Sequence, residues 1–495
     1  MGADSLRRVA IALGSNLGDR PGNLREALRR LGATPEVAVQ ATSRLYESSP
    51  MYVTDQPAFL NAAAEIRTTL PPLELLRVLK DVERDMGRGF GGDQVRWGPR
   101  PIDLDIIFYE DQTVMHVETD STRELIVPHP RWQERDFVKG PLSDLTGSWA
   151  STSISPTGLD RNLLASKRLW MEQGGERELR RASQDGSLGC VLPVGGGATW
   201  QWSQGTSVMG VLNVTPDSFS DGGSFRHVDA AIEQAISMVQ DGADVVDVGG
   251  QSTRPGAELI SAAEEWERVG PVLDAIRQEG LQVPVSIDTF YAEVAAKAVA
   301  AGANIVNDVS GGTLDPNMHE TVADAGVSYV LMHMRGTPET MQSASNVAYG
   351  DVCRDVAQSL QASCDRAVRA GIESWRIILD PGIGFAKTPE GSTELVANLP
   401  TFRSHISEPY KALPVLLGAS RKKFLGHMIG RPEEDASGRD WASCAINAIG
   451  ALHGANIIRT HNVRAAKDAT MVADAVIDRA GRERGPSVHP DPSLM

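Results

Sequence analysis

Two aspartates and three arginines stand close together in the first third of the chain. Asp103 and Asp105 are two residues apart in the apolar stretch DLDIIFYE. On a strand they face the same side, where a divalent cation relieves the repulsion between two carboxylates. The nearby arginines have forked donors that match phosphate oxygens; they are Arg88, Arg96 and Arg100. Metal with several arginines is typical of phosphoryl-type transfer. The alternative is an exposed polar strand edge.

Further polar residues are spread over the rest of the chain, at or just after the ends of short apolar runs. The run ends carry Asn213, Asp247, Asp288, Asn307 with Asp308, His333, Asp380, Gly418 followed by SRK, and Arg459 with His461. One group favours an anion beside a hard cation: Asn213, Thr253, Arg254, Arg459 and His461. Another offers acceptors to a ligand that carries several N–H donors: Asp288, Asn307 and Asp380. Lys422 can supply a cation toward a ring carbonyl or nitrogen of such a ligand.

Taken singly, several of these residues also fit a structural role. Asp247, Asp308 and His333 could each be a helix cap or a supporting residue. Asn213 could be a loop cap. Their convergence on one site therefore depends on the elements that carry them.

The apolar runs predict eight strands. They are VMGVLN, DVVDV, VPVSID, NIVND, SYVLMH, RIILD, PVLLG and NIIRT, with helical stretches between them. Eight strands with helices over about 280 residues predict an α/β TIM (β/α)8 barrel. All strands of such a barrel open their carboxyl ends on one face, so the polar residues are expected at a single mouth.

Residues from Val9 to about Leu145 predict a smaller α+β unit. Strand-like VAIALGS, helical PGNLREALRRL, two further strand-like runs, helical PPLELLRVLKDVERDMG and strand-like DLDIIFYE follow one another. This order favours an α+β sandwich. The loop GRGFGGDQ could close over a nucleotide, and Trp97 could stack on its base or pack in the core.

The composition limits the classes of partner. The chain has 495 residues, 41% of them hydrophobic, and a formal charge of −16. This charge argues against a nucleic-acid partner, and no apolar run reaches the length of a membrane span. Four cysteines without paired spacing favour reduced thiols. We expect a cytoplasmic protein without a targeting segment, with a mature organellar form as the alternative.

Four motifs of the first third occur in the order of a known family. ALGSNLGDR, DQPAFLNAA, RWGPRPIDLDI and VPHPR resemble hydroxymethyl-dihydropterin pyrophosphokinase over about Val9 to Leu145. The resemblance implies a ferredoxin-like fold, with two magnesium ions at Asp103 and Asp105. It implies that Arg88 and Arg100 assist pyrophosphate transfer from ATP. The implied contacts are Glu83, Arg96, Trp97, His129 and Arg135 for ATP, and Phe59, Asn61 and Phe137 for pterin. Phe59 replaces a frequent tyrosine, and Ser48-Ser49 replaces Thr-Pro.

Eight motifs of the remaining chain resemble dihydropteroate synthase from Val208 to Ala475. They are VMGVLNVTPDSFSDGG, DVGGQSTRPGA, VSIDT, IVNDVSGG, LMHMRGTP, LDPGIGFAK, GASRKKF and IIRTHNV. The resemblance implies condensation of dihydropterin pyrophosphate with p-aminobenzoate. The implied residues are Asn213 for magnesium; Thr253, Arg254, Arg459 and His461 for pyrophosphate; Asp288, Asn307, Asp380 and Lys422 for pterin; and Phe385 and Ser420 for p-aminobenzoate. Asp288 and Lys422 are expected to be catalytic. Gln251 replaces a frequent glutamate.

The two resemblances together predict a bifunctional folate-pathway enzyme whose first domain makes the substrate of the second. We expect a pyrophosphokinase domain at 1–172, a linker at 173–186 and a synthase barrel at 187–495 that begins with a hairpin at 187–205. A homodimer through the barrel is expected. The alternatives are a pterin-binding methyltransferase barrel, which would have no pyrophosphate to hold, and a non-catalytic binding protein, which would not need the complete metal and arginine sets.

Overall fold

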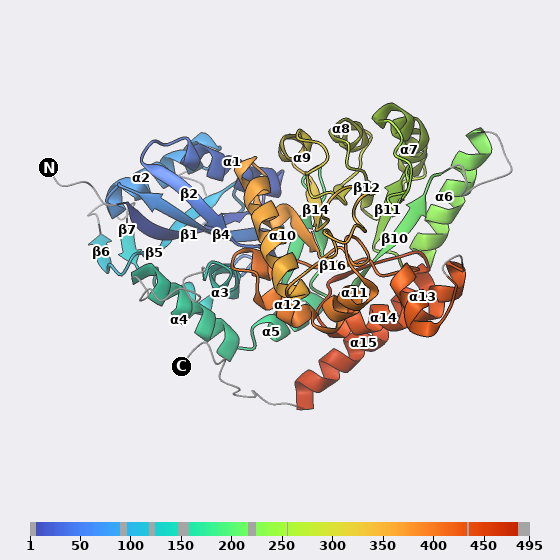
Figure 1. Cartoon of the computed structure of the whole chain (residues 1–495). Helices are drawn as coiled ribbons and strands as arrows, with labels where there is room; N and C mark the ends of the chain where they lie inside the picture. The colour runs from blue at the N-terminus through green and yellow to red at the C-terminus, as the bar shows by residue number, and fades with distance from the viewer. Residues whose placement is uncertain are drawn as a thin grey trace.

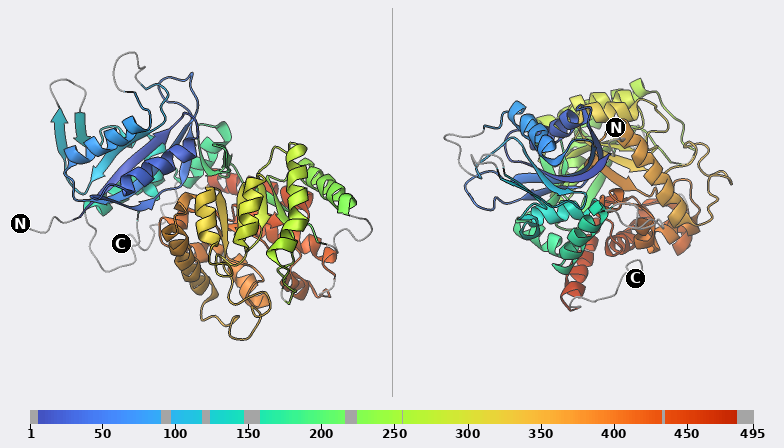
Figure 2. Two further views of the ribbon diagram at one scale, coloured as in Figure 1. Left: turned by 90° about the horizontal axis from the view of Figure 1, so that it is seen from above. Right: turned by 90° about the vertical axis from the view of Figure 1, so that its left-hand side faces the viewer.

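The computed structural model describes residues 6–89, 97–117, 124–146, 158–215, 224–254, 256–432 and 435–483. They form two units that lie side by side, a layered sheet with helices and a barrel (Figure 1; Figure 2). The layered unit comes from the amino-terminal third of the chain, and the barrel follows it.

The first unit has an antiparallel sheet in the order β5-β1-β4-β3, with β2 also paired to β4. Its strands are β1 (Arg7–Ser15), β2 (Val37–Thr42), β3 (Leu45–Ser48), β4 (Phe59–Thr68) and β5 (Asp103–Tyr109). The crossover helices are α1 (Arg20–Gly32) and α2 (Pro72–Asp85), and the opposite layer contains α3 (Asp136–Ser143) and α4 (Gly158–Glu172). A small ribbon, β6 (Val114–Val117) with β7 (Glu124–Val127), forms a separate two-stranded sheet that packs in the same core as α1 and α2. The predicted ferredoxin-like fold is confirmed.

Alternation along the strands explains the two helical layers. Val9 and Ile11 of β1 belong to the apolar core that contains α1 and α2, whereas Ala10 packs in the core that contains α3 and α4. Successive side chains on a strand point to opposite faces. Because both faces of this sheet are apolar, it is covered on both sides.

The barrel is a parallel sheet in the order β15-β14-β13-β12-β11-β10-β17-β16, and a bridge between Leu379 and Val415 joins its two ends. Its strands are β10 (Ser207–Asn213), β11 (Val245–Gly249), β12 (Val285–Asp288), β13 (Ile305–Asp308), β14 (Ser328–Met332), β15 (Ile377–Asp380), β16 (Leu416–Leu417) and β17 (Ile457–Thr460). All eight predicted strands therefore form, and the predicted TIM barrel is confirmed.

Helices surround this barrel (Figure 1). They are α6 (Ser224–Gln240), α7 (Ala262–Gln278), α8 (Ala292–Ala300), α9 (Met318–Ala325), α10 (Val352–Arg369), α11 (Pro389–Ala397), α12 (Leu399–Ser404), α13 (Lys423–Ile429), α14 (Asp440–Leu452) and α15 (Val463–Glu483). Between β14 and α10 the chain runs through a long connection without a helix or strand.

The region between the two units differs from the sequence-based expectation. Helix α5 (Glu176–Asp185) occupies most of the expected linker, and β8 (Leu188–Pro193) pairs with β3, so the expected hairpin extends the first sheet. Strand β9 (Thr199–Gln201) completes it. All six residues of β8 are buried, because the hairpin also packs against the barrel. By pairing with β3, β8 covers the strand edge that β3 would otherwise expose.

The same hairpin closes the amino-terminal end of the barrel. Cys190, Leu192 and Trp202 share one apolar cluster with residues near the beginnings of the barrel strands, among them Ile305 and Ile457. The hydroxyl of Ser328 donates to Pro193 O at 2.8 Å. The carboxyl ends of the strands, where the candidate site residues stand, are therefore at the opposite end of the barrel from the first unit.

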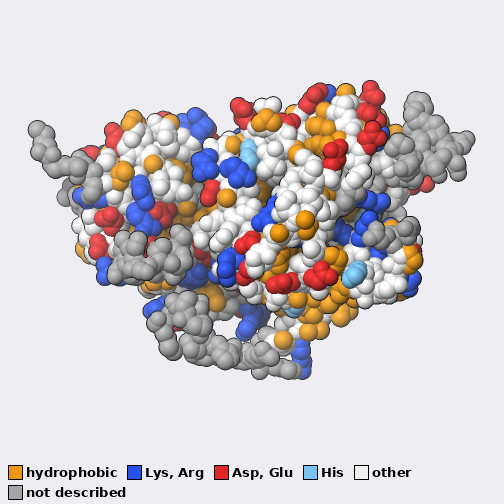
Figure 3. Space-filling view, in the orientation of Figure 1, with side chains coloured by type: hydrophobic (Ala, Val, Ile, Leu, Met, Phe, Trp, Pro, Cys, Tyr) orange, Lys and Arg blue, Asp and Glu red, His pale blue; other side chains and the backbone are white. Residues whose placement is uncertain are grey.

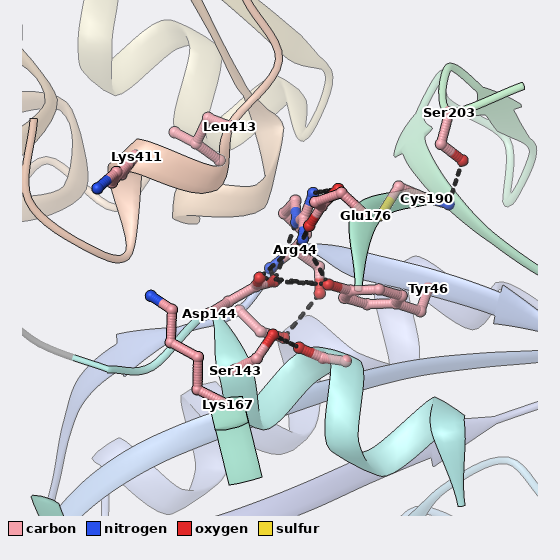
Figure 4. Close-up of polar contacts among 12 residues, drawn as sticks. Arg44, Tyr46, Ser143, Asp144, Lys167, Glu176, Cys190, Ser203, Lys411 and Leu413 are labelled. Carbon is pink, nitrogen blue, oxygen red and sulfur yellow. Dashed lines mark hydrogen bonds and ion pairs between the residues drawn. The ribbon is translucent and has the colours of Figure 1, made fainter. Parts of the chain in front are cut away.

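A buried polar cluster ties α5 to the first unit (Figure 4). Arg44 donates to Asp144 Oδ1 at 2.9 Å and to Glu176 Oε1 at 2.6 Å, and Tyr46 Oη lies 3.2 Å from Asp144 Oδ1. Arg44 and Asp144 are nearly inaccessible to solvent. The buried pair is thus Arg44 with Asp144, and the exposed Glu176 links α5 to this pair through its contact with Arg44.

Candidate active sites

The first candidate site is an open cleft in the first unit, with an empty volume of about 750 Å³. It lies on one face of the sheet, beside the strand ends that carry Ser48, Asn61 and Asp103. Eight residues predicted from the sequence line it: Phe59, Asn61, Trp97, Arg100, Asp103, Asp105, Arg135 and Phe137. The structure thus brings the expected metal and pterin residues of this unit together with part of the expected ATP set, whereas Glu83, Arg88 and His129 do not line the cleft.

Asp103 and Asp105 lie on the same side of β5, while Leu104 between them is buried. Arg88 pairs with Asp103 Oδ1, and Arg100 Nη1 lies 3.0 Å from Asp103 Oδ2. Burial alone would raise the pKa of Asp103, but the charges of Arg88, Lys80 and Arg100 outweigh it and hold the pKa below its usual value. Asp103 is therefore ionised at neutral pH.

Glu83 lies behind these carboxylates and does not line the cleft. Its side chain is fully buried, and its Oε1 accepts from Lys80 Nζ at 2.7 Å and from the Leu104 amide at 2.6 Å. Its Oε2 pairs with Arg88 at 2.8 Å. Glu83 thus orients Lys80 and Arg88. Sequence reasoning missed Lys80, although its position one turn before Glu83 on α2 was a usable signal.

The mouth of the cleft carries aromatic and basic groups. The rings of Trp97 and Tyr52 are 4.8 Å apart, so Trp97 forms a wall of the cleft and is not part of the core. The Arg135 guanidinium lies 5.8 Å from the Phe137 ring. His129 does not line the cleft; burial lowers its pKa, which favours the neutral imidazole. Tyr52 was not predicted, and Arg96 lies outside the described residues.

The donor set of this cleft fits a hard cation. Asp103 and Asp105 present oxygen ligands on one side, next to arginines suited to phosphate. In the part of the chain that the structure describes, no three His, Cys, Asp or Glu side chains gather into a metal cluster. Further ligands of a cation would therefore come from phosphate oxygens and water.

The second candidate site lies at the carboxyl ends of the barrel strands. Arg459 on β17 donates from Nε to Asp247 Oδ2 and from Nη2 to Asp288 Oδ2, both at 2.6 Å. Asn307 Nδ2 donates to the same Asp247 oxygen at 3.1 Å. Residues from four different strands thus meet, as a barrel mouth predicts.

The pterin candidates are two acids and one amide that are buried at or next to the carboxyl ends of their strands, namely Asp288, Asn307 and Asp380. Burial, together with the nearby carboxylates and against the charge of Arg459, raises the pKa of Asp288 to about 7. Within the described residues, its Oδ1 is buried without a hydrogen-bond partner. Asp380 Oδ1 accepts from the Gly382 amide at 2.7 Å. A ligand with N–H donors would satisfy the free Asp288 oxygen.

Lys422 and Phe385 lie together at the mouth. Lys422 Nζ donates to Ile383 O and stands 4.2 Å from the centre of the Phe385 ring. Burial lowers the pKa of Lys422 to about 7, although Asp380 raises it. The amine therefore changes charge near neutral pH.

The anion candidates gather around His461. Its Nδ1 lies 3.1 Å from Ser420 Oγ, and burial together with Arg459, Arg421 and Arg254 lowers its pKa to about 3. His461 is therefore a neutral donor among arginines. Thr253 and Arg254 lie on the connection that follows β11. This concentration of positive charge suits an anion.

Asn213 is the last residue of β10 and is partly exposed beside Gly249 of β11. One amide oxygen is too small a donor set for a metal site of its own. It fits magnesium only if an anionic ligand supplies further oxygens, and the neighbouring anion candidates make such a ligand reasonable.

The structural alternatives apply to several residues. Asp308 accepts from the Ser310 and Gly312 amides, both at 2.7 Å, and therefore supports a loop. Asp247 holds Arg459 and Asn307. His333 is buried and its Nδ1 lies 3.0 Å from Lys387 Nζ. These residues support the mouth from beneath.

Sequence reasoning did not predict the buried carboxyl group of Glu265, which lies behind the mouth of the barrel. Glu265 of α7 accepts from Gln251 Nε2 at 2.8 Å and from Thr289 Oγ1 at 3.2 Å. Burial and the nearby Asp288 raise the pKa of Glu265 to about 8. A glutamate at position 251 would face this group, so Gln251 avoids a buried pair of acids. The only sequence signal was the unusual glutamine.

Two family models match the chain. One is described as Pterin binding enzyme and matches residues 209–461; the other is described as 7,8-dihydro-6-hydroxymethylpterin-pyrophosphokinase (HPPK) and matches residues 10–147. A relative from Arabidopsis thaliana, called "Folate synthesis bifunctional protein, mitochondrial", is 48% identical over 485 residues, which cover 95% of this chain and 83% of the relative.

Solved structures resemble both parts. Yersinia pestis dihydropteroate synthase, solved with a sulfonamide drug complex, is 37% identical with a TM-score of 0.53 and covers 58% of this chain and 99% of that one. Plasmodium falciparum HPPK-DHPS with pteroate has a TM-score of 0.70 over 95% of this chain and 98% of that one; at 20% identity it shows a shared fold.

Among the helices of the described ranges, none has the length and apolar character that a membrane span requires.

Proposed function

We propose roles for individual residues on the premise that the chain belongs to the family of bifunctional folate synthesis proteins. It catalyses two sequential reactions of folate biosynthesis. The first transfers pyrophosphate from ATP to 6-hydroxymethyl-7,8-dihydropterin and releases AMP. The second condenses the dihydropterin pyrophosphate with p-aminobenzoate and gives dihydropteroate and pyrophosphate. The methyltransferase and non-catalytic alternatives are set aside.

We assign the first reaction to the open cleft of the first unit. All residues that line this cleft lie within 10–147, the range that the pyrophosphokinase family model matches, and within the proposed domain 1–172. The observation that carries this assignment is the pair Asp103 and Asp105 on one side of β5, with Arg88 and Arg100 bound to Asp103. The two aspartates would hold magnesium, which shields the phosphate charge when bound. Arg88 and Arg100 would then turn from Asp103 toward the transferring phosphates, where their charge stabilises the transition state.

Further residues are proposed to orient the two substrates. Trp97 and Arg135, which line the cleft, are proposed for ATP together with His129 and Arg96, and Glu83 would act through Lys80 and Arg88. Asn61 would read the pterin edge between Phe59 and Phe137, which line the same cleft. Its Nδ2 donates to Ser48 Oγ at 3.0 Å, so Ser48, one of the residues that replace a Thr-Pro pair, fixes the amide orientation.

We assign the second reaction to the barrel mouth, in the proposed domain 187–495. Asp288, Asn307, Asp380 and Lys422 would bind the pterin, and Thr253, Arg254, Arg459 and His461 the pyrophosphate. Asn213 would share a magnesium ion with that pyrophosphate. The observation that carries the pterin assignment is the buried, unpartnered Asp288 Oδ1 at the mouth.

The chemistry of this mouth favours a dissociative substitution. The bond between the pterin methylene carbon and the pyrophosphate oxygen breaks first, and the anion site receives the leaving pyrophosphate. The carboxylates of Asp288 and Asp380 stabilise the positive charge left on the pterin. The amine of p-aminobenzoate, held near Phe385 and Ser420, attacks the methylene carbon and then loses a proton to solvent. No covalent enzyme intermediate is required.

We also propose a homodimer through the barrel. Helices α14 and α15 pack on each other and expose large apolar side chains, and Figure 3 shows hydrophobic side chains gathered over these helices. The exposed residues are Trp441, Ile449, Leu452, Met471, Val472 and Val476. Such a surface marks an interface. Sedimentation of wild type should give a dimer, and Ile449→Asp with Val472→Asp should give a monomer.

For the compartment we propose the cytoplasm, with an organelle as the alternative raised by the mitochondrial name of the Arabidopsis thaliana relative. The four cysteines are free thiols, which suits either reducing compartment. Cell fractionation decides between them.

Separate assays of the two reactions test the residue assignments. The first is followed by AMP release without p-aminobenzoate, and the second by dihydropteroate formation from supplied dihydropterin pyrophosphate. Arg100→Ala should impair the first reaction alone, and Arg459→Ala the second alone. Loss of both reactions in either variant would contradict the division of labour.

A further inference from the structure

The connection after β15 carries Phe385 into the barrel mouth in an unusual backbone conformation. Ala386, the next residue, is fully buried and has a φ of 50°. This left-handed conformation is unfavourable for any residue with a Cβ, and glycine adopts it without that penalty. Something must therefore hold the backbone at Ala386.

Tyr349, from the long connection between β14 and α10, makes the contact that does so. Its hydroxyl donates to the carbonyl oxygen of Ala386 at 2.8 Å. Burial raises the pKa of Tyr349 to about 12, so the hydroxyl keeps its proton throughout the neutral range. The bond acts on the strained residue itself.

The tyrosine ring is in turn held by its own neighbours. The Arg335 guanidinium lies 4.0 Å from the ring centre, and its Nη1 donates to Ala348 O at 2.8 Å. From the same connection, Gln342 Nε2 donates to Gly384 O at 3.2 Å. The β14–α10 connection therefore fastens the residues on both sides of Phe385.

A second anchor fixes the carbonyl of Phe385. Lys387 Nζ donates to Phe385 O at 2.9 Å and lies 3.0 Å from His333 Nδ1. The Phe385 ring packs near Met332 and Val309 and stands beside Lys422. With its backbone held from two sides, the ring has little freedom at the mouth.

We propose that Tyr349 is a positioning residue for p-aminobenzoate, because its hydroxyl holds Ala386 in the conformation that presents the Phe385 ring to this substrate. The inference rests on the proposed function of Phe385. Tyr349 itself acts through Ala386 and is not a catalytic residue.

Steady-state kinetics of Tyr349→Phe test the inference, since this change removes the hydroxyl and keeps the ring on Arg335. We expect the KM for p-aminobenzoate to rise about fivefold, the effect of losing one net hydrogen bond, while kcat and the KM for dihydropterin pyrophosphate stay unchanged. Adding Ala386→Gly should bring the KM back to within about twofold, because glycine keeps the left-handed conformation without help.

Tyr410→Phe is the matched control. The Tyr410 hydroxyl donates to Asp365 at 2.9 Å on the outer helical layer, and its loss should leave both KM values unchanged. An unchanged p-aminobenzoate KM in Tyr349→Phe, an equal rise of both KM values, or no rescue by Ala386→Gly would overturn the inference. Phe385→Ala separates the proposed function of Phe385 from the positioning role of Tyr349. If Phe385→Ala leaves the KM for p-aminobenzoate unchanged, the proposed function of Phe385 fails. If Phe385→Ala raises this KM but Tyr349→Phe does not, only the inference about Tyr349 fails.

Discussion

Arg459 Nη2 lies 2.6 Å from Asp288 Oδ2, so a residue proposed for pyrophosphate is paired with one proposed for pterin. Before substrate binds, Arg459 is thus the counter-charge of Asp288 as well as of Asp247. When pyrophosphate draws Arg459 toward itself, Asp288 would lose its counter-charge while positive charge develops on the pterin. The contact thereby couples the anion site to the acid that stabilises the cation.

Asp288→Asn tests this coupling. The amide can still accept hydrogen bonds from the pterin but has no charge to stabilise the cation. We expect turnover of the second reaction to fall about a hundredfold, with a much smaller change in pterin binding. Asp274→Asn, which alters an exposed acid on α7, is the control. Equal losses of turnover and pterin affinity would rule out the electrostatic role.

The pH dependence of the second reaction follows from two groups. Asp288, with a pKa raised to about 7, becomes neutral as the pH falls below this value. Lys422, with a pKa lowered to about 7, loses its charge as the pH rises above it. If activity needs both charges, kcat/KM has a narrow maximum near pH 7.

Lys422→Arg distinguishes the two limbs of this profile. Arginine stays protonated at all relevant pH values, so the alkaline decline should disappear while the acid decline remains. The measurement is kcat/KM for dihydropteroate formation across the neutral range. An alkaline limb identical to that of wild type would show that Lys422 does not cause it.

Asp105→Asn tests the metal assignment in the first unit. The change removes one carboxylate from the pair on β5, so AMP formation should fall at least about a hundredfold and need more magnesium. The barrel should still convert supplied dihydropterin pyrophosphate at the wild-type rate. Asp81→Asn, at an exposed acid that pairs with Arg84 on α2, should affect neither reaction. An Asp105→Asn variant with normal AMP formation would disprove the assignment.

Asn213→Ala tests the metal assignment in the barrel. In an Asp105→Asn background, which silences the first site, calorimetry should show about tenfold weaker pyrophosphate binding in the presence of magnesium. Without magnesium the variant and its parent should bind pyrophosphate alike, and pteroate should bind almost as before. A loss of affinity that does not depend on magnesium would mean that Asn213 contacts the ligand directly.

Local sequence patterns were sufficient for the strands that carry both sites. Most barrel strands are apolar runs with a polar residue at or just after their carboxyl end, so Asp288 and Arg459 could be placed at one mouth without coordinates. Contacts between distant segments were not accessible in this way. The bond between Tyr349 and Ala386 joins two loops, and the half-buried Lys80 and the buried Glu265 act from helices that look ordinary in sequence.

The hairpin shows a different limit of sequence reasoning. Both faces of its strand β8 are apolar, which predicts that the strand is buried but not which elements pack against it. The structure shows two partners, β3 of the first sheet and the closed end of the barrel. Helix α5 was missed because it consists almost entirely of polar and charged residues, with only Leu179 and Ser183 buried, and such a composition is equally typical of a linker.

The most direct test of the account is one coupled assay with the purified chain, in which hydroxymethyl-dihydropterin, ATP, magnesium and p-aminobenzoate are supplied together. We predict that AMP and dihydropteroate form in equal amounts, and that without p-aminobenzoate AMP still forms while dihydropterin pyrophosphate accumulates. AMP release without any dihydropteroate, or dihydropteroate without AMP, would contradict two consecutive reactions on this chain.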